Sequence, residues 1–566
     1  MNILLRTIWF WMPILLLYPM WTSSQPSILG FPDSDVYKHV WGHWWVRYML
    51  FERAELPFQQ DVLFFPGGGK FFCLDTLHSI LLAPISWMGL VSSYNVGIVL
   101  QLMVFALGVQ QLSSAIGMTK ESLWLPTGLS LLSSWAFAFP IASGVSEHMG
   151  FCLSPWIVYY CLRSFTEQCS KPVILFSVLW LFQALLCWSF AIITGLVVLL
   201  GLGLWLSKRP WLTGTEPWRF SAGILKRLGT SAIILGIPVL ILYGLVYSLS
   251  TGSDAVYQRS LSIFPSHLPW DNPQSNGFTL SILFSPLNGG LRTVDTGIET
   301  LRYAGYPGAI LMGLGLWAAW KGPLLVRFLL ISALSFGALS LGPVVRFVPT
   351  DVGGINLWYG LWYAVVPFFN VLEHNVDRLI LPAYVCLVFG VTRYLQNLSH
   401  RRQLVVGLLC LFEWLCFSPA PWPTPLAPAA VHPISIAIAE GPTGAVIDIP
   451  YTVPQTTQAI GDIFFQQTIH NQPIPYRLEG VGPNMVYPTV RDNPFFERIH
   501  NLSQQQGTAQ EAMCAGTQDL VEMGFRYVVL RQDSLNDSRQ LEHTLTQCLT
   551  LVKSEAERQL YQFSVP

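Results

Sequence analysis

The chain has 566 residues, of which 52% are hydrophobic and only 11% are charged, whereas soluble domains contain roughly 25% charged residues. Its mean hydropathy of +0.46 predicts a protein that crosses a membrane several times. The 31 Lys and Arg residues are balanced by 32 Asp and Glu residues, so the chain lacks the positive field that recruits nucleic acid, and nucleic acid is excluded as a partner.

The first apolar segment, MNILLRTIWFWMPILLLYPMW, has aromatic flanks and no small-residue cleavage site after it. It is therefore predicted to be a retained transmembrane helix rather than a signal peptide. Arg6 near its start is expected on the cytoplasmic side, which places residues 22–75 outside as the first outer loop.

Further apolar runs predict a mainly helical, polytopic domain over residues 1–420, with about 11–13 membrane segments of about 20 residues each. The runs cover residues 76–92, 95–116, 123–142, 149–163, 172–206, 229–249, 303–320, 325–342, 357–369, 378–396 and 403–418. The run 172–206 is predicted to form two short helices that turn near Leu185–Phe190. The run 76–92 is short and contains His78 and Pro84, so we predict an interfacial or re-entrant segment, with a short true helix as the alternative.

Basic residues predict the orientation of these segments in the membrane. The densest basic loop, residues 208–227, is expected in the cytoplasm. Counting spans forward from it places residues 250–302, residues 343–376 and everything after about residue 420 outside.

A proline-rich stretch, SPAPWPTPLAPAAVHP, predicts a stiff linker, which we assign to residues 421–440. A small extracytoplasmic α/β domain is predicted over residues 441–566. Its expected elements are buried strands at Gly444–Pro450 and Arg526–Arg531, a final strand at 559–565 and an amphipathic helix at 509–525.

Ten cysteines are spread through the chain without any C-x-x-C pair, so no zinc or redox motif is visible. Cys514 and Cys548 are the two that fall in the C-terminal domain. In an oxidising compartment they could form a disulfide, and two free thiols are the alternative.

Most of the polar residues suited to chemistry lie in the outer loops rather than in the apolar runs. A channel or a proton-coupled carrier would need ionisable residues near mid-membrane, where Gln183 and Glu413 are the polar exceptions. Several short loops that converge at one face of the membrane predict a pocket at that face.

Three stretches carry a resemblance to a known family. Asp35 is followed by Trp41 and Trp45 in a W-x-x-x-W spacing and then by VLFFPGGGKFF; the later loops contain GVSEHMGFCLSPW and FFNVLEHNVDRLILP. In these stretches the chain resembles the bacterial GT-C superfamily of integral-membrane glycosyltransferases. Arg378 matches the final Arg of the family's late Arg-x-Pro-Ser-Arg stretch. The first Arg of that stretch is replaced near His374, and Ser34 stands where the family has Gly before the acid.

The resemblance implies a sugar donor attached to a polyprenyl phosphate, with transfer to a glycan, lipid or protein acceptor on the extracytoplasmic face of the cell inner membrane. A physical argument agrees with this implication. Nucleotide sugars are made in the cytoplasm, so an outward-facing transferase needs an activated sugar that has already crossed the membrane. A lipid phosphate carrier supplies one.

Asp35 is the predicted catalytic residue, because a carboxylate in the first loop could take the proton of the acceptor hydroxyl as that hydroxyl attacks the anomeric carbon. The alternative is a helix N-cap, since DSDVYKHVWGHWW resembles the start of a helix. Of the two acids in this stretch, Asp33 is the better cap candidate.

Two cations are predicted to bind the donor phosphate as it gains negative charge. Arg378 is the first candidate, with an interfacial anchor as its alternative role. Lys70 is the second, because it follows a glycine triplet whose backbone could approach phosphate oxygens.

Glu147, His148 and Asp33 are predicted to contact the acceptor or the donor, with a solvated turn as the alternative for Glu147 and His148. Trp41, Trp44 and Trp45 could stack on sugar rings, but an aromatic belt at the membrane surface is the preferred interpretation.

No cofactor is predicted. Asp33 and Asp35 form a D-x-D spacing that could hold a divalent metal with a lipid phosphate, yet we predict transfer without a metal. Two other classes of function stay open: a lipid or sugar transporter, and a non-catalytic scaffold with an outer binding domain. The transporter would show an internal repeat, and none is found.

Overall fold

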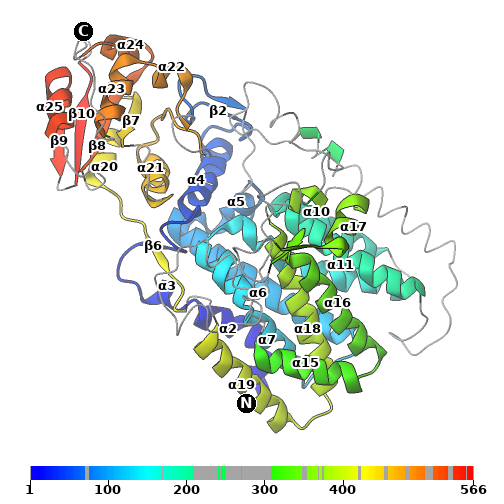
Figure 1. The fold of residues 1–566 in the computed structure, drawn as a ribbon. Coiled ribbons are helices and arrows are strands. Elements are labelled where there is room, and N and C mark those ends of the chain that lie inside the picture. The colour runs from blue at the N-terminus through cyan, green and yellow to red at the C-terminus, as the bar shows by residue number, and fades with distance from the viewer. Residues whose placement is uncertain are drawn as a thin grey trace.

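The structure is a computed structural model in which a bundle of helices carries a smaller domain at one end (Figure 1). It describes residues 2–70, 76–167, 170–207, 308–346, 353–366, 369–372, 375–418, 422–450, 457–478, 485–503, 514–532, 539–555 and 557–564, together with isolated positions between 229 and 269. The basic loop at 208–227, most of the run 229–249, the outer loop at 250–302 and His374 therefore lie outside the described residues.

The N-terminal segment differs from the single helix that its composition predicts. It forms α1 (Asn2–Arg6), α2 (Ile8–Leu16) and α3 (Pro19–Thr22). Pro19 stands at the first position of α3, where its missing N–H is tolerated, and Pro13 lies inside α2, where it removes a helical hydrogen bond. The prolines thus account for part of the interruption.

The helical domain continues with elements that match most of the predicted apolar runs. They are α5 (Thr76–Leu82), η2 (Ala83–Met88), α6 (Leu90–Ala115), α7 (Trp124–Leu131), α8 (Ser134–Ala136), η3 (Phe137–Ile141), η4 (Ser146–Leu153), α9 (Ser154–Thr166), α10 (Lys171–Leu186) and α11 (Trp188–Ser207). The predicted turn near Leu185–Phe190 is confirmed, because α10 and α11 are separated at Cys187. The run 123–142, by contrast, is divided among α7, α8 and η3.

In the second half of the helical domain, a short two-stranded sheet and several short helices come between the longer helices α16 and α18. Its elements are α15 (Ala309–Lys321), α16 (Leu324–Ser340), β4 (Val344–Val345), β5 (Gly354–Ile355), α17 (Leu357–Val365), η6 (Phe369–Leu372), η7 (Val376–Leu379), α18 (Ile380–Leu395) and α19 (His400–Phe417). Glu413 on α19 caps α15, because its carboxylate accepts hydrogen bonds from the amides of Ala309 (2.5 Å) and Ile310 (3.1 Å). This intramembrane carboxylate thus has a structural partner.

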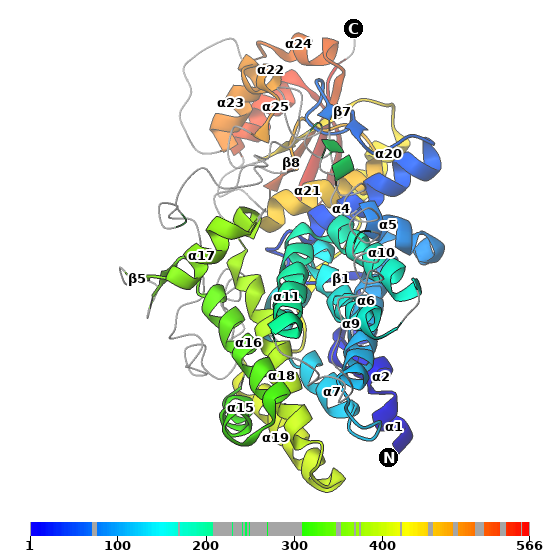
Figure 2. The same cartoon turned by 90° about the vertical axis from the view of Figure 1, so that its right-hand side faces the viewer.

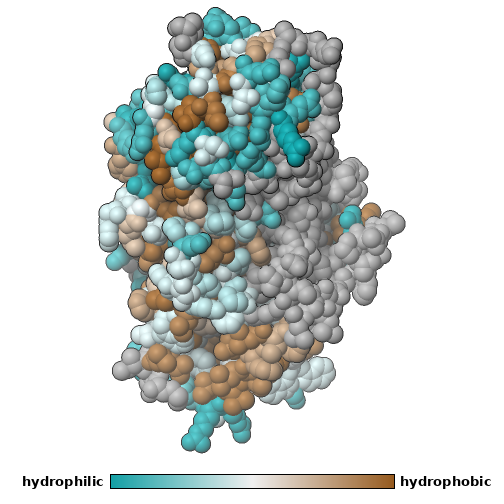
Figure 3. Space-filling model, turned by 90° about the vertical axis from the view of Figure 1, so that its left-hand side faces the viewer, coloured by the Kyte–Doolittle hydropathy of each residue, from teal (hydrophilic) through white to brown (hydrophobic). Residues whose placement is uncertain are grey.

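By length and composition, two helices in the described part of the chain could each cross a membrane, Leu90–Ala115 and Val376–Leu395. Shorter apolar helices accompany them, including Thr76–Met88, which is helical but far below the length needed to span the bilayer. Figure 3 shows apolar side chains gathered on the lower part of one face, over the helices, while hydrophilic residues predominate over the C-terminal domain.

The C-terminal domain is a four-stranded mixed sheet with the strand order β7-β8-β10-β9. Strands β7 (Ala445–Ile449) and β8 (Phe525–Arg531) are parallel, and β10 (Arg558–Gln562) pairs antiparallel with β8 and with β9 (Thr550–Glu555). The strands predicted from GAVIDIP, RYVVLR and QLYQFSV are therefore confirmed, and β9 is an additional strand. The domain's other elements are α20 (Pro433–Glu440), α21 (Thr457–His470), α22 (Pro488–Arg491), α23 (Pro494–Ser503), α24 (Thr517–Glu522) and α25 (Arg539–Cys548).

Cys514 and Cys548 form a disulfide, which decides between the two alternatives left open by the sequence. Of the amphipathic helix predicted at 509–525, the described part contains α24 (Thr517–Glu522). Residues 504–513 lie outside the described residues.

The proline-rich stretch is more structured than a stiff, extended linker. Its β6 (Leu426–Pro428) pairs antiparallel with β1 (Ser27–Leu29) of the first loop, and α20 occupies the last part of the range 421–440. The stretch is therefore held against the first loop as it passes from the helices to the C-terminal domain (Figure 1).

Helix α4 (Val36–Arg47) joins the two domains, because its side chains belong to two hydrophobic cores. Val36, Tyr37 and Val40 pack into the core of the helical domain. Trp41 and Trp45 are fully buried in the core of the C-terminal domain, and the indole N–H of Trp41 donates to Gln467 Oε1 at 2.8 Å. The prediction of an aromatic belt at the membrane surface is therefore wrong for these tryptophans: they are buried between protein elements.

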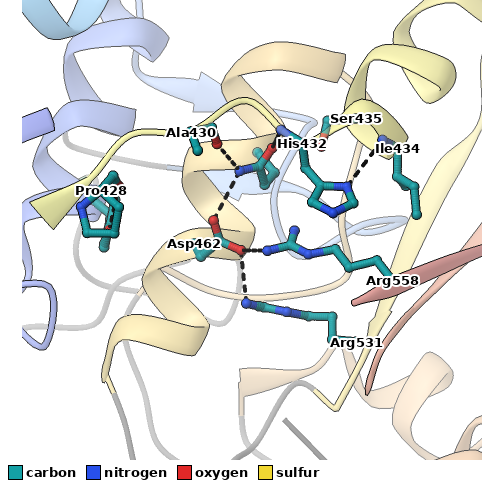
Figure 4. Close-up of polar contacts among 10 residues, drawn as sticks. Pro428, Ala430, His432, Ile434, Ser435, Asp462, Arg531 and Arg558 are labelled. Atoms are coloured by element: carbon teal, nitrogen blue, oxygen red, sulfur yellow. Dashed lines mark hydrogen bonds and ion pairs between the residues drawn. The ribbon is translucent and has the colours of Figure 1, made fainter. Parts of the chain in front are cut away.

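A buried ionic cluster lies where α4 meets the C-terminal domain (Figure 4). Asp462 on α21 accepts hydrogen bonds from Arg531 (2.9 Å) and Arg558 (2.6 Å). Burial alone would raise the pKa of Asp462, but the two guanidinium groups outweigh it and hold that pKa below its usual value. Nearby, Tyr37 of α4 donates to Pro428 O at 2.8 Å.

Replacing Trp41 by Ala should destabilise the protein by about 3–5 kcal/mol, since it removes a fully buried indole and leaves a cavity between the domains. Denaturant unfolding of the purified full-length chain, followed by near-UV circular dichroism, measures this loss. Trp87→Ala is the matched control, because Trp87 is 81% exposed and should change the free energy of unfolding by no more than about 0.5 kcal/mol. Equal losses for both variants would contradict the buried role of Trp41.

Asp448 on β7 provides a test of pH dependence. It is buried, and burial raises its pKa from 3.8 to about 6, although Arg531 and Arg558 act in the opposite direction. Between about pH 4 and pH 6 the folded chain then binds more protons than the unfolded chain, so the free energy of unfolding falls as the pH rises.

Asp448→Asn should remove this fall, so that the variant gains up to roughly 3 kcal/mol on the wild type between pH 4 and pH 7. Denaturant titrations of both proteins across this range give the difference. Parallel pH curves for the two proteins would show that Asp448 keeps its ordinary pKa.

Candidate active site

The start of α4 places two carboxylates on the outside of the first loop. Ser34, which is buried between them, accepts a hydrogen bond from Val36 N at 3.2 Å, and its hydroxyl lies 2.7 Å from Ser143 O. Asp35 occupies the N-cap position of α4 without a side-chain capping bond. The better cap candidate from the sequence, Asp33, does not stand at the N-cap position, which Asp35 occupies.

Asp35 is accessible to solvent. Its side chain is 53% exposed, and its carboxylate pairs with Lys38 at 2.8 Å. Such an exposed ion pair contributes little to stability, so the carboxylate is held near α4 without being buried by it. This arrangement is compatible with a group that meets a ligand from the outer solution.

Asp33 lies close enough to Tyr37 to affect its titration. Burial raises the pKa of Tyr37, and the charges of Asp462 and Asp33 raise it further, while Arg531 lowers it. Asp33 is thus near the boundary between the helical domain and the C-terminal domain.

The loop with Glu147 and His148 is fixed by Tyr94 on α6. The Tyr94 hydroxyl donates to Gly144 O and accepts from Ser146 N at 3.1 Å. His43 on α4 adds a contact, with its Nε2 3.4 Å from Ser146 Oγ. Gly144 has a positive φ of +66°, and an added Cβ there would lie 1.9 Å from Leu29 O. Only glycine allows the first loop to approach this closely.

Arg378 is buried at the point where η7 runs into α18, and only 4% of its surface is exposed. Its Nη1 donates to Ser189 Oγ and to Cys187 Sγ (3.2 Å). Its Cζ lies 5.7 Å from the centre of the Phe190 ring. Among the described residues the guanidinium forms no ion pair, and its Nε is buried without a hydrogen-bond partner. In the described part of the chain its direct hydrogen-bond partners are therefore neutral groups.

The loop that carries Glu147 reaches this arginine through Cys187. The Cys187 thiol donates to Glu147 Oε1 at 3.7 Å, and Arg378 donates to the same sulfur. Gly150 packs against this turn, because an added Cβ would lie 2.7 Å from Cys187 Cβ. The structure thus brings the side chains of Glu147 and Arg378 to the same thiol. His148 follows Glu147 in the chain.

The segment 143–150 connects the two halves of the predicted site. On one side, Ser143 and Gly144 of this segment pack against the loop that carries Asp35. On the other side it reaches Arg378 through Glu147 and Cys187. Asp35 and Arg378 therefore approach the same segment rather than opposite ends of the helical domain.

Lys70 is located differently. It lies in β3 (Gly69–Lys70), which pairs with β2 (Gln59–Gln60) in the first loop. The preceding Phe64 N and Phe65 N donate to carbonyls of the C-terminal domain, at Tyr476 and Ile474. The contacts of this hairpin are thus with the C-terminal domain, and those of Arg378 are with α11.

No group of three or more His, Cys, Asp or Glu residues that could hold a metal ion is found within the described ranges of the chain. The prediction of metal-independent transfer is not tested by this result. It stays a prediction.

Sequence reasoning missed Cys187, Ser189 and Tyr94 as parts of this site. Cys187 and Ser189 stand in the stretch LLCWSF, which the apolar pattern identified only as a turn. Polar residues at a break between two apolar helices, on the same side of the membrane as Arg378, were the signal available. Tyr94 stands in the short stretch between the apolar runs 76–92 and 95–116, and no motif singled it out.

No protein-family model matches the sequence, and no curated protein matches it. The match is to solved structures. The arabinofuranosyltransferase AftD from Mycobacteria superposes with a TM-score of 0.56 at 14% identity, covering 99% of this chain and 41% of that chain. The chain has the fold of the GT-C glycosyltransferases. This chain spans about two fifths of the length of AftD.

Weaker likenesses are found to two other solved proteins. The oligosaccharyltransferase of Archaeoglobus fulgidus gives a TM-score of 0.42 at 11% identity, covering 94% of this chain and 70% of that one. ArnT from Cupriavidus metallidurans bound to undecaprenyl phosphate gives 0.39 at 13% identity, covering 98% of both chains. The GT-C fold is supported by the first superposition, whose TM-score exceeds 0.5.

Proposed function

We propose that the chain is a membrane glycosyltransferase that moves a sugar from a polyprenyl phosphate to an acceptor on the extracytoplasmic face of the cell inner membrane. The GT-C fold supports the class of enzyme. The observation that carries the proposal is the state of Arg378, a buried cation whose direct hydrogen-bond partners among the described residues are neutral.

A buried guanidinium that has no direct ion pair is costly, because removing an ion from water costs several kcal/mol even after relaxation. The thiol of Cys187 and the hydroxyl of Ser189 offset part of this cost but carry no formal negative charge. An anion bound beside Arg378 would complete the site. A phosphate suits a guanidinium because its oxygens match the planar array of N–H donors.

The start of α18 adds to this preference. Arg378 lies in the first turn of the continuous helix Val376–Leu395, which η7 and α18 form together, and the N-terminal end of a helix carries partial positive charge. A donor phosphate beside Arg378 would thus meet a side-chain cation and a helix dipole together. Lys70 stays the second proposed phosphate ligand, although the described contacts of its hairpin are with the C-terminal domain and not with the Arg378 segment.

The reaction we propose is a single displacement with inversion. The acceptor oxygen forms a bond to the anomeric carbon while the bond between that carbon and the phosphate oxygen breaks. The leaving phosphate takes the electron pair, and its new charge is stabilised by Arg378. The acceptor proton passes to the carboxylate of Asp35, which is exposed and so accessible from the outer solution.

Glu147, His148 and Asp33 are proposed to contact the acceptor or the sugar. The carboxylate of Glu147 lies at the Cys187 thiol that also binds Arg378, so it borders the proposed phosphate position. A carboxylate so near that position would repel the anion and is better suited to sugar hydroxyls. The C-terminal domain, held on α4, is proposed to lie outside the membrane and to support or select the acceptor.

Release of lipid phosphate from a panel of polyprenyl-phosphate sugars tests the function directly. The purified protein in detergent or lipid nanodiscs is incubated with each donor and with candidate acceptors. An arabinofuranosyl donor belongs in the panel because the similar AftD is an arabinofuranosyltransferase. Binding without turnover by any donor would favour a transporter or scaffold over an enzyme.

Asp35→Asn keeps the size of the side chain and removes the base, so kcat should fall by about 100- to 10,000-fold while the protein still folds. Asp61→Asn is the matched control, because Asp61 is an exposed acid of the same loop that pairs with Arg53. The initial rate of lipid-phosphate release measures both variants. Wild-type turnover by Asp35→Asn would remove Asp35 from the catalytic role.

Arg378→Gln should lower kcat by about 100- to 1,000-fold, since the developing charge on the phosphate loses its cation. It should also weaken binding of the sugar-free polyprenyl phosphate, measured by competition with a labelled lipid phosphate. Arg393→Gln, in the last turn of the same helix, should leave both quantities unchanged. Equal lipid-phosphate affinity in all three proteins would contradict the phosphate site.

A further inference from the structure

Helix α17 is a short outer helix that cannot cross a membrane. It covers the nine residues Leu357–Val365, which at about 1.5 Å per residue span far less than the roughly 30 Å of a hydrocarbon core. Along the chain it comes between two longer helices of the bundle, α16 and α18. Its side chains must therefore be explained by something other than a span.

The two faces of α17 differ sharply in burial. Leu357, Leu361 and Val365 recur every four residues and are 76%, 55% and 64% exposed, so they form one stripe along the helix. Tyr359 and Tyr363 occupy the opposite face and are fully buried. None of the nine residues is charged. A helix that shows water such a stripe, without a polar group in it, is unfavourable by its apolar area alone.

The buried face holds the segment that leads to Arg378. Both tyrosines contact the ring of Phe369, with centroid distances of 5.2 Å for Tyr359 and 6.4 Å for Tyr363. Phe369 is itself fully buried. It begins η6 (Phe369–Leu372), which precedes the turn with Arg378. The position of α17 therefore constrains that segment.

The exposed stripe adjoins an apolar surface of the helical domain. Trp358 of α17 donates its indole N–H to Ser335 Oγ of α16 at 3.1 Å, and α16 exposes the large apolar residues Ile331 and Leu334 on its own surface. Figure 2 shows α17 beside the end of α16 that is nearer to the C-terminal domain. In a membrane fold these exposed faces of α16 meet lipid, so the stripe of α17 continues the same surface.

The residue types of α17 fit the membrane boundary. The helix contains Trp358 and Trp362 in addition to its two tyrosines, and Trp and Tyr are enriched where the hydrocarbon meets the headgroups. At its start, Asn356 caps the helix through Tyr359 N (3.2 Å) and donates to Ala338 O and Gly342 O (both 2.8 Å). The cap fixes α17 to the end of α16 and so fixes the level of α17 relative to the helical bundle.

We propose that α17 lies in the plane of the outer membrane surface, with Leu357, Leu361 and Val365 among the acyl chains of the outer leaflet. In this position its buried face sets the depth at which the Arg378 segment meets the membrane. The occupant of the stripe is lipid acyl chain rather than a protein partner. The part of this proposal that concerns Arg378 rests on the proposed function, whereas the contact with lipid does not.

The test places a fluorescent label at the stripe and asks which quencher reaches it. Leu361→Cys is labelled with an environment-sensitive dye in lipid nanodiscs, and unmodified protein treated in the same way gives the background from native cysteines. Nitroxide groups on lipid acyl chains should quench the label, and aqueous iodide should not. Leu357→Cys is a second variant of the same stripe, with the same expected result.

Two control positions calibrate the measurement. Leu334→Cys on α16 should behave like the stripe, because it lies on the proposed lipid-facing surface. Leu551→Cys on β9, exposed in the C-terminal domain, should show the reverse pattern, with quenching by iodide and not by lipid nitroxide. If the labels at residues 361 and 357 are quenched by iodide, the stripe faces water; if they are quenched by neither agent, a protein covers it; in both cases the proposal fails. No turnover is needed, so this outcome is independent of whether the chain proves to be a glycosyltransferase.

Discussion

The burial of α4 in two hydrophobic cores at once is the constraint on which the rest of the structure depends. Its first turns contribute Tyr37 and Val40 to the helical domain, and its later turns contribute Trp41 and Trp45 to the C-terminal domain. A helix is rigid over this length, so neither domain can move far without exposing part of the other's core. The pairing of β1 with β6 reinforces the same junction, because it ties the first loop to the stretch that leads into the C-terminal domain.

This junction also fixes the candidate site, because Asp35 stands at the start of the shared helix. Ser34 and Gly144 bring the start of α4 against the loop that carries Glu147. The hydroxyl of Tyr94 holds that loop through hydrogen bonds to the backbone of Gly144 and Ser146. The contacts of Ser34, Gly144 and Tyr94 thus set the position of the proposed base, while its carboxylate remains exposed. A rigid scaffold with an accessible charged group is the arrangement that positioning a reacting group requires.

More of the fold than of the candidate site could be predicted from the sequence. Apolar runs, together with the buried strands read from GAVIDIP and RYVVLR, were sufficient to predict a helical membrane domain and a small α/β domain, because burial leaves an apolar signal in the sequence. Trp41 and Trp45 show the limit of that signal: their apolar character was evident, but whether lipid or protein would cover them depended on a contact some 420 residues away, with Gln467. Ser34 and Cys187 were missed for a related reason, since their roles come from neighbours that are distant in sequence.

Two buried arginine sites in this chain show why Arg378 is the better candidate for a ligand site. Arg531 and Arg558 share the carboxylate of Asp462, which also accepts from Gln466, so the charge there is matched within the protein and the cluster serves to hold elements together. Arg378 is equally buried but has a thiol, a hydroxyl and an aromatic ring as its partners. Among the described residues no carboxylate forms an ion pair with Arg378, and the carboxylate of Glu147 reaches it only through the Cys187 thiol. This cation lies where η7 runs into α18, beside the loops of the proposed site, where an incoming anion would give it a direct partner.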